Sequence, residues 1–267
     1  MVEFTSDNLS LKEISVSGQC FRMKELFTDE DGSHFEIIAA DKRLLAVQNK
    51  NRLYFDCSRG DFDGFWSDYF DLGADYGRII SSIDKNDAYL TAAAKSCSGI
   101  RILRQDLWEM IITFIISQQN NIPRIKKCVE RLCERFGQEK DGFFAFPKAS
   151  AIAVTDEDAL TALGMGYRAK YILQAARQVV CGQLDLEELR EMDYETAKKR
   201  LLKMYGVGIK VAECICLFAL HHIGAFPIDT HIKQVLGEHY PDGFPLEKYS
   251  GYAGILQQYM FYFELNG

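Results

Sequence analysis

A single lysine stands in an apolar segment directly after a glycine-containing turn. In Leu201–Phe218 (LLKMYGVGIKVAECICLF), Gly206 and Gly208 predict a tight hairpin between two helices, and Lys210 falls at the start of the second helix. An amine at the positive end of a helix and among apolar side chains can lose its proton and act as a nucleophile. The alternative is a surface lysine whose stem packs while its charged head reaches solvent.

The same hairpin has the features of an anion site. Its glycines let another backbone approach closely, and the free N–H groups at the start of the second helix attract phosphate. Basic residues without an intervening acid lie just upstream, at Lys198, Lys199, Arg200 and Lys203. A nucleic-acid backbone would suit this surface. A simple glycine-capped connector between two helices is the alternative.

A carboxylate follows later in the chain. Asp229, in Ala225–His231 (AFPIDTH), comes after an apolar stretch and directly before a predicted helix. This position suits a helix N-cap, which would fix the direction of the carboxylate. A carboxylate near an amine can break a glycosidic C–N bond, because the carboxylate stabilises a cationic sugar while the amine attacks its anomeric carbon. A purely structural cap is the alternative.

The composition is that of a folded chain with room for two modest domains. Of 267 residues, 48% are hydrophobic and 26% are charged, which excludes disorder, collagen-like repeats and coiled coil for the whole chain. The net charge of −7 argues against a nucleic-acid partner, but residues 1–100 hold −6 of it and residues 101–140 sum to +3. A basic face can therefore exist within the acidic total.

The cysteines and the apolar segments bear on location. The eight cysteines are scattered without a CxxC pair, so we expect reduced, mostly buried thiols in an intracellular protein. The amino-terminal residues lack the basic start and apolar run of a signal peptide. No segment reaches the roughly 18 apolar residues of a membrane span. We expect no membrane partner and a cytoplasmic or nucleoid location.

The hydrophobic pattern predicts a sheet followed by helices. Apolar segments at 35–40, 43–47 and 52–55, with turns at Asp31-Gly32 and Asn49–Asn51, predict antiparallel strands. Helical spacing begins near Phe62, and the helices predicted after residue 100 are 107–117, 122–136, 168–181, 186–191, 194–204, 210–221, 229–239 and 249–264. We predict an α+β protein, with a β-sheet domain containing one or two helices at 1–100 and an all-helical domain at 101–267.

These segments resemble the helix-hairpin-helix DNA glycosylase superfamily, most nearly its 8-oxoguanine DNA glycosylase branch. The resemblance runs from SGQCFR at Ser17–Arg22 to YAGILQQYMF at Tyr252–Phe261, and its most specific block is GVGIKVAECICLFAL…FPIDTH. It implies that Lys210 attacks C1′ of the damaged nucleotide, expels the base and leaves a Schiff base that promotes β-elimination. It also implies that Asp229 is the catalytic aspartate.

The resemblance further implies a pocket for a base flipped out of the duplex. Cys214 and Phe261 would sandwich the base, and Gln257 would contact its Watson–Crick edge. The carbonyl of Gly18 would accept a hydrogen bond from N7–H, a proton that 8-oxoguanine has and guanine lacks. From spacing alone, Cys214 and Phe261 would instead be assigned to the core.

The opposite strand would have contacts of its own. By resemblance, Gln119 fills the gap left by the flipped nucleotide, Arg124 and Arg168 recognise the estranged cytosine, and Tyr167 is a wedge. Gln119 departs from the asparagine usual in the animal enzymes. His231 matches a position near the 5′ phosphate. A solvated helix face is the alternative for Arg124, and a capping or core imidazole is the alternative for His231.

The implied partner is double-stranded DNA with 8-oxoguanine opposite cytosine, bound by a monomer. We expect no required cofactor, because the four-cysteine iron–sulfur spacing and zinc-ligand spacings are missing from the sequence. The hairpin carbonyls are a possible site for a structural cation. In a eukaryote the location would be nuclear. The alternatives are a glycosylase with another or broader damaged-base range and a non-catalytic DNA-binding module.

Overall fold

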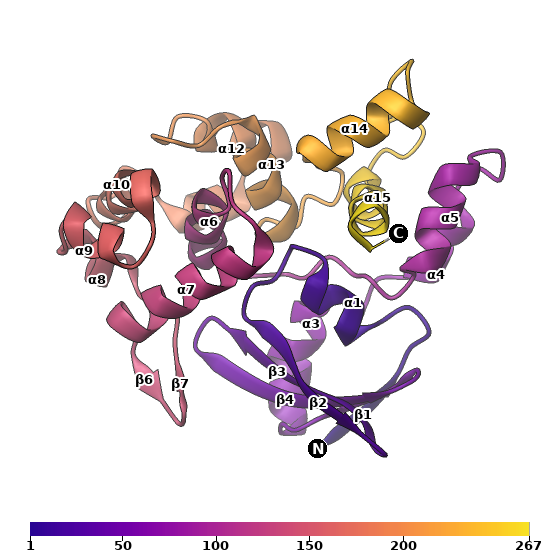
Figure 1. Ribbon diagram of the computed structural model, residues 1–267, viewed down its shortest axis with the longest axis horizontal. Helices are drawn as coiled ribbons and strands as arrows, with labels where there is room; N and C mark the ends of the chain where they lie inside the picture. Colours follow the sequence, from indigo (N-terminus) through magenta and orange to yellow (C-terminus); the bar gives the residue numbers. More distant parts are fainter. Residues whose placement is uncertain (267) are drawn as a thin grey trace. The chain divides into compact units, whose positions relative to one another are not determined.

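The computed structural model describes residues 1–266, and its contacts divide the chain into two compact units. The first unit contains Met1–Ile37, Leu44–Arg104 and the chain from His221 onward, and the second contains Ile38–Arg43 and Gln105–Leu220. Figure 1 shows the elements of both units, coloured along the sequence. The two units carry different parts of the predicted site.

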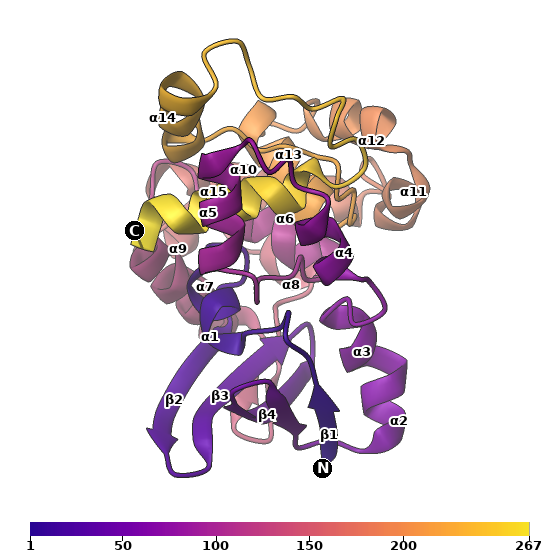
Figure 2. The same cartoon turned by 90° about the vertical axis from the view of Figure 1, so that its right-hand side faces the viewer.

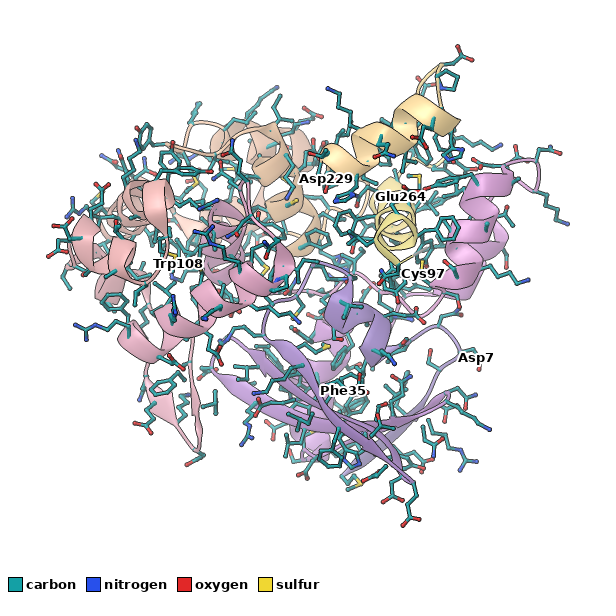
Figure 3. The ribbon with its side chains drawn as sticks, viewed as in Figure 1. Asp7, Phe35, Cys97, Trp108, Asp229 and Glu264 are labelled. Atoms are coloured by element: carbon teal, nitrogen blue, oxygen red, sulfur yellow. The ribbon has the colours of Figure 1, made fainter. Side chains whose placement is uncertain are left out.

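A five-stranded antiparallel sheet is the main feature of the amino-terminal part. Its order is β1-β5-β4-β3-β2, and its strands are Val2–Thr5 (β1), Met23–Asp29 (β2), Gly32–Ala39 (β3), Lys42–Asn49 (β4) and Arg52–Phe55 (β5). Register pairs include Val2 with Phe55 and Met23 with Ile37. Inward residues such as Phe35, labelled in Figure 3, are buried, as the alternation of a half-buried sheet requires.

A continuous helical stretch packs on this sheet through aromatic rings. It consists of α2 (Arg59–Asp61), the π-helical turn η1 (Phe62–Trp66) and α3 (Ser67–Tyr69). The Phe55 ring centroid lies 5.3 Å from that of Phe62 and 5.5 Å from that of Phe70. These large buried rings supply much of the apolar area that holds the helices to the sheet.

The remaining helices of the first unit pack around the carboxyl-terminal helix. Figures 1 and 2 both show α15 (Ala253–Asn266) running between α5 (Ala88–Ser96) and α14 (Thr230–His239). Residues 253–260 of α15 are buried on all sides, which explains a helix apolar around most of its circumference. The short helices α1 (Leu11–Val16) and α4 (Tyr76–Ser81) complete the unit.

The second unit is built around one buried helix. All ten residues of α6 (Leu107–Ile116) are buried, including Trp108, which is labelled in Figure 3. Helices α7 (Ile122–Phe136), α10 (Ala169–Val180), α11 (Leu186–Glu191) and α13 (Ile209–Phe218) contact it. The other elements are the two-residue strands β6 (Glu139–Lys140) and β7 (Phe143–Phe144), the helices α8 (Ala149–Ala153), α9 (Glu157–Ala162) and α12 (Tyr194–Leu201), and the 3₁₀ turn η2 (Gly166–Arg168).

The α+β prediction is confirmed, with local corrections. Strands 35–40, 43–47 and 52–55 correspond to β3, β4 and β5, and helices 107–117, 122–136 and 186–191 are found within one residue or so. The pattern missed α1, α5, α8, α9 and the small β6–β7 hairpin. These elements are short, and short segments carry too few repeats to show a period. The division into domains at 1–100 and 101–267 stays a prediction.

The cysteines and the helix lengths complete the description. All eight cysteines are free thiols; six of them are buried, Cys57 is half-buried and Cys181 is exposed. Within residues 1–266, no helix combines the length and apolar composition needed to cross a bilayer.

Candidate active site

The predicted hairpin joins α12 to α13 in the second unit. Gly206 has a φ of +83°, in the left-handed region that favours glycine. A Cβ at this position would lie 2.3 Å from the ring of Tyr171, so the turn also needs a residue without a side chain. Gly208 is extended and a Cβ there would meet no atom within 4 Å. The two glycines therefore differ: Gly206 shapes the turn, and Gly208 leaves open space before α13.

The amino end of α13 has no side-chain cap. Gly208 is its N-cap residue, and no side chain accepts a hydrogen bond from the first N–H groups. Those N–H groups point beyond the helix start, together with the positive end of the helix dipole. The segment thus offers an anion the donors that a capping side chain would otherwise occupy.

Lys210 is half-buried in the first turn of α13. Its ammonium nitrogen lies 5.5 Å from the ring centroid of Phe114 on α6. Within residues 1–266 the Lys210 amine makes no hydrogen bond or ion pair. Cys214, one helical turn further on, is 3% exposed and lies in the same unit. The amine therefore lies beside an aromatic ring and has no carboxylate partner among the described residues.

A buried charge cluster connects the two arms of the hairpin. Glu213 of α13 lies 2.5 Å from the Lys198 nitrogen and accepts a hydrogen bond of 2.6 Å from the Tyr194 hydroxyl, both on α12. Burial is the largest single effect and lowers the pKa of Lys198, but the hydrogen bonds to Glu213 and Tyr194 and the attraction of Glu213 together outweigh it, so the pKa is raised overall. Sequence reasoning missed this cluster, although an acid inside the apolar run VAECICLF was a signal for it.

Two of the four basic residues before the hairpin are thus engaged within the protein. Lys198 is paired with Glu213, and Arg200 donates to the carbonyl of Gln183. Lys199 and Lys203 are exposed. These two residues are the ones whose charge is directed to solvent near the hairpin.

Asp229 lies in the first unit, where it caps α14. Its carboxylate accepts a hydrogen bond of 2.9 Å from the N–H of Ile232. Figure 3 labels Asp229 at the start of this helix. The capping role inferred from the sequence is present, and it fixes the direction of a half-buried carboxylate. One carboxylate oxygen is used in the cap, and the other remains for a second partner.

The other predicted residues of the first unit lie on α14, α15 and the turn after α1. His231 is exposed, and its ring meets that of Phe261 edge to face at 5.8 Å. Gln257 is 3% exposed, and its side-chain oxygen accepts a long 3.5 Å hydrogen bond from Gln258. Gly18 has a φ of +74°, which explains a glycine at this turn.

Buried hydrogen bonds fix the turn that contains Gly18. The side-chain amide of Gln19 donates to the Ser17 hydroxyl and to the Arg101 carbonyl, each at 3.0 Å. The oxygen of the same amide accepts from the N–H of Leu103 at 2.9 Å. The carbonyl of Gly18 is therefore carried by a rigid peptide, as a selective acceptor requires.

A loop between α6 and α7 comes together with η2 in the second unit. Arg168 is 4% exposed, and its guanidinium donates to the carbonyls of Gln118 (2.8 Å from Nε) and Gln119 (3.0 Å). The Tyr167 hydroxyl donates to the same Gln118 carbonyl at 3.3 Å. Gln119 is exposed and has a φ of +46°. The structure thus joins three predicted residues that are separated by almost 50 positions in the sequence.

Arg124 lies in the first turn of α7. The side chain of Asn121 caps this helix by accepting from the N–H of Arg124 at 3.0 Å, and Pro123 occupies its first turn. The Arg124 side chain is exposed. It therefore remains available to a partner, in contrast to the buried guanidinium of Arg168.

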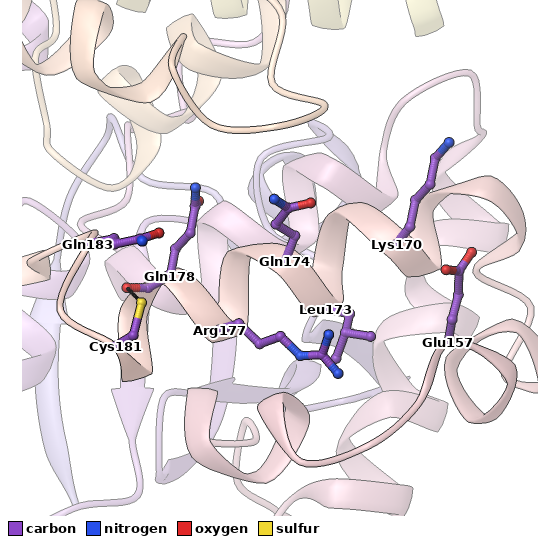
Figure 4. A pocket seen from close by; sticks show the side chains of 8 residues that line it. All are labelled: Glu157, Lys170, Leu173, Gln174, Arg177, Gln178, Cys181 and Gln183. Carbon is purple, nitrogen blue, oxygen red and sulfur yellow. Dashed lines mark hydrogen bonds between the residues drawn. The ribbon is translucent and has the colours of Figure 1, made fainter.

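A shallow cleft of about 350 Å³ lies along the outer face of α10. Figure 4 shows its lining side chains, which include Lys170, Gln174, Arg177 and Gln178 from successive turns. None of its lining residues belongs to the predicted site. Among the described residues, no group of three or more His, Cys, Asp or Glu side chains is arranged to hold a metal ion.

Two protein families match successive parts of the chain. Residues 1–111 match the family described as "8-oxoguanine DNA glycosylase, N-terminal domain", and residues 112–243 match "HhH-GPD superfamily base excision DNA repair protein". A Saccharomyces cerevisiae N-glycosylase/DNA lyase is 37% identical over 164 residues, which are 55% of this chain and 44% of the yeast protein. The alignment thus spans less than half of that relative.

Two solved structures match nearly the whole chain. The structure of MBOgg1 in complex with a low affinity DNA ligand is 35% identical, with 99% of each chain covered and a TM-score of 0.90. The Clostridium acetobutylicum 8-oxoguanine glycosylase/lyase, in complex with double-stranded DNA containing cytosine opposite 8-oxoG, is 34% identical, with 96% of this chain and 92% of that chain covered and a TM-score of 0.88. With both family matches and these relatives, the chain belongs to the 8-oxoguanine DNA glycosylase family.

Proposed function

We propose that this protein is a bifunctional DNA glycosylase and AP lyase that excises 8-oxoguanine opposite cytosine. The observation that carries the proposal is Lys210. It is an amine without a hydrogen bond or ion pair in residues 1–266, and it stands at an uncapped helix start behind a glycine turn, in a chain of this family. A module that only binds phosphate needs the turn and its N–H groups, but it does not need such an amine.

The proposed chemistry uses Lys210 as the nucleophile. Its nitrogen attacks C1′ of the damaged nucleotide, the C1′–N9 bond breaks, and the base leaves with the electron pair and takes up a proton. Opening of the sugar ring then gives a Schiff base. Loss of a 2′ proton from the Schiff base breaks the C3′–O bond and cuts the strand 3′ to the lesion. The negative charge of Asp229 stabilises the cationic sugar as the base departs.

Base recognition would use one backbone carbonyl and three side chains. The Gly18 carbonyl accepts from N7–H of 8-oxoguanine, and against guanine it would face a second acceptor with no proton between them. Gln257 contacts the Watson–Crick edge, and Phe261 and Cys214 stack on the two faces of the base. The burial of Gln257 and the fixed peptide of Gly18 support these roles.

Contacts with the rest of the duplex would come from the loop, the hairpin and α14. Gln119 fills the gap left by the flipped nucleotide, Tyr167 wedges beside it, and Arg124 and Arg168 contact the estranged cytosine. The N–H groups after Gly206 and Gly208 bind a phosphate, and His231 lies near the 5′ phosphate.

The hairpin also has carbonyls for a cation. No backbone N–H of the described chain donates to the carbonyls of Tyr205, Gly206 or Val207, so their lone pairs fit a structural cation that helps to hold phosphate. The reaction itself needs no cofactor. The partner is duplex DNA, one copy of the chain acts per lesion, and the enzyme works where the genome is, in the nucleoid or the nucleus.

Borohydride trapping tests the proposal. A duplex with one 8-oxoguanine opposite cytosine is incubated with protein and borohydride, which reduces a Schiff base to a stable amine. We expect a covalent protein–DNA band with the wild type, no band with Lys210→Gln, and a weak band on undamaged guanine. Salt-sensitive binding to the duplex should remain in Lys210→Gln.

Two results would overturn parts of the proposal. Bands on other lesions but not on this duplex would keep the lysine chemistry and refute the base assignment. No band on any lesion, despite salt-sensitive DNA binding, would favour a non-catalytic module.

A further inference from the structure

Gln119 has a backbone conformation that its own side chain disfavours. Its φ is +46°, and the left-handed region is occupied mainly by glycine and, among other residues, by asparagine and aspartate. The residue is exposed, so burial of its side chain does not enforce the conformation. Something else in the loop must therefore hold it.

The buried guanidinium of Arg168 is positioned to do this. Nε donates to the Gln118 carbonyl at 2.8 Å, and one terminal nitrogen donates to the carbonyls of both Gln118 and Gln119, the latter at 3.0 Å. The other terminal nitrogen donates to the Met165 carbonyl at 3.4 Å. Peptide planes on both sides of the Gln119 α-carbon are thereby fixed from one rigid planar group.

A second arginine in the protein is used in the same way. Arg101, also 4% exposed, donates to the carbonyls of Phe70 and Asp71, and Asp71 has a φ of +51°. Arg101 lies 4.1 Å from the ring centroid of Tyr76, as Arg168 lies 4.5 Å from that of Tyr167. Each of the two buried arginines therefore holds the carbonyl of a left-handed residue.

We propose that Arg168 is a positioning residue that holds Gln119 in its left-handed conformation before DNA binds, so that the gap-filling side chain is preformed. The inference rests on the proposed function, and it adds a role to the contact with cytosine proposed above. All three guanidinium nitrogens are already engaged in the free protein. These bonds use four of the five N–H donors, and the fifth, on the nitrogen that donates to Met165, is left for contact with a base.

The test is whether the effect of Arg168→Ala on excision depends on the residue at position 119. Asparagine tolerates the left-handed region better than glutamine. Arg168→Ala should therefore slow single-turnover excision on 8-oxoguanine opposite cytosine by about 10- to 100-fold. In the Gln119→Asn background, the same substitution should cost only about 3-fold, because the conformation needs less support. Equal losses in both backgrounds would overturn the positioning role.

The opposite base provides a second readout. A positioning residue affects gap filling whatever the opposite base is, so Arg168→Ala should slow excision opposite adenine as well as opposite cytosine, with the larger loss opposite cytosine, where the base contact is lost too. A loss confined to cytosine would show direct base contact only and would contradict the proposal. Arg78→Ala removes an equal charge from an exposed site on α4 and should leave excision unchanged.

Folding and the chemistry are controlled separately. If Arg168→Ala does not fold, as judged by thermal unfolding, Arg168→Lys keeps the charge without the fork and takes its place in the comparison. Trapping at an abasic aldehyde in single-stranded DNA needs Lys210 but no gap filling, so it should be unchanged by Arg168→Ala. If the wild type does not trap at the abasic aldehyde, the proposed function fails. Equilibrium binding to a duplex with a tetrahydrofuran site opposite cytosine then still measures whether the effect of Arg168→Ala depends on the residue at position 119.

Discussion

The start of α13 and the start of α14 place their functional residues in different ways. Lys210 has no part in capping its helix, because the turn before it is shaped by Gly206 and braced by Lys198 and Glu213. Asp229 is itself the cap of α14. Lys210 therefore has no capping role, whereas Asp229 caps its own helix.

This difference predicts whether a substitution at each helix start changes the chemistry, the stability, or both. A change at Lys210 should alter chemistry and leave stability alone. A change at Asp229 should alter both, unless the new residue also caps the helix. Substitutions at the residues that support the hairpin, such as Gly206 and Glu213, should lower stability more than they alter the chemistry.

The largest effect is expected at Lys210. Lys210→Gln should reduce excision by at least about 10³-fold, because the nucleophile is removed. Its free energy of unfolding should stay within about 0.5 kcal/mol of the wild type, since the amine makes no hydrogen bond or ion pair in the described chain. Single-turnover excision and thermal unfolding measure the two quantities. A strongly destabilised variant would show that Lys210 has a structural role after all.

Substitutions at Asp229 should separate its capping role from its role in the chemistry. Asp229→Asn keeps a capping side chain, so stability should change little while excision falls on the order of 10²-fold with the lost charge. Asp229→Ala should lose as much activity and, in addition, about 1 kcal/mol of unfolding free energy. Asp156→Ala is the matched control, because Asp156 caps α9 through the N–H of Ala159 and lies outside the proposed site. It should lower stability alone.

The hairpin glycines provide a matched pair. Gly206→Ala should cost roughly 2–3 kcal/mol of unfolding free energy, because an alanine must adopt a φ of +83° and its Cβ would collide with Tyr171. Gly208→Ala should cost no more than about 0.5 kcal/mol, since its backbone is extended and the space is open. Urea unfolding compares them. Equal costs would mean that the turn is not the support of α13.

The charge cluster should have a smaller effect on stability than Gly206, and its effect should depend on pH. Glu213→Gln should cost about 1–2 kcal/mol near pH 7, less than a fully buried pair because the Lys198 side chain is 24% exposed. A raised pKa means that the contribution of Lys198 is complete below its unfolded value of about 10.5 and is lost as the pH rises through the folded value. The difference between wild type and variant should shrink above about pH 10.5 in denaturant titrations. A difference that grows with pH would contradict the pairing.

Local signals were enough for much of the fold. Periodicity located α6, α7 and α11, and short apolar-rich segments between turns located β3 to β5. A polar residue between an apolar stretch and a predicted helix located the cap at Asp229. These features depend on residues within a turn or two of each other, so the sequence carries them directly. The short helices α1, α8 and α9 were missed because their few residues show no period.

The sequence by itself determined the hairpin, the order of sheet and helices, and the set of residues that carry the family resemblance. Only the tertiary structure decided what those residues contact. It placed Arg168 on the carbonyls of Gln118 and Gln119, a contact that the sequence did not predict. It paired Lys198 with Glu213, where the sequence predicted a basic surface for a nucleic-acid backbone. The physical reason is that a side chain's partner is set by the packing of distant helices, and no local pattern encodes that distance.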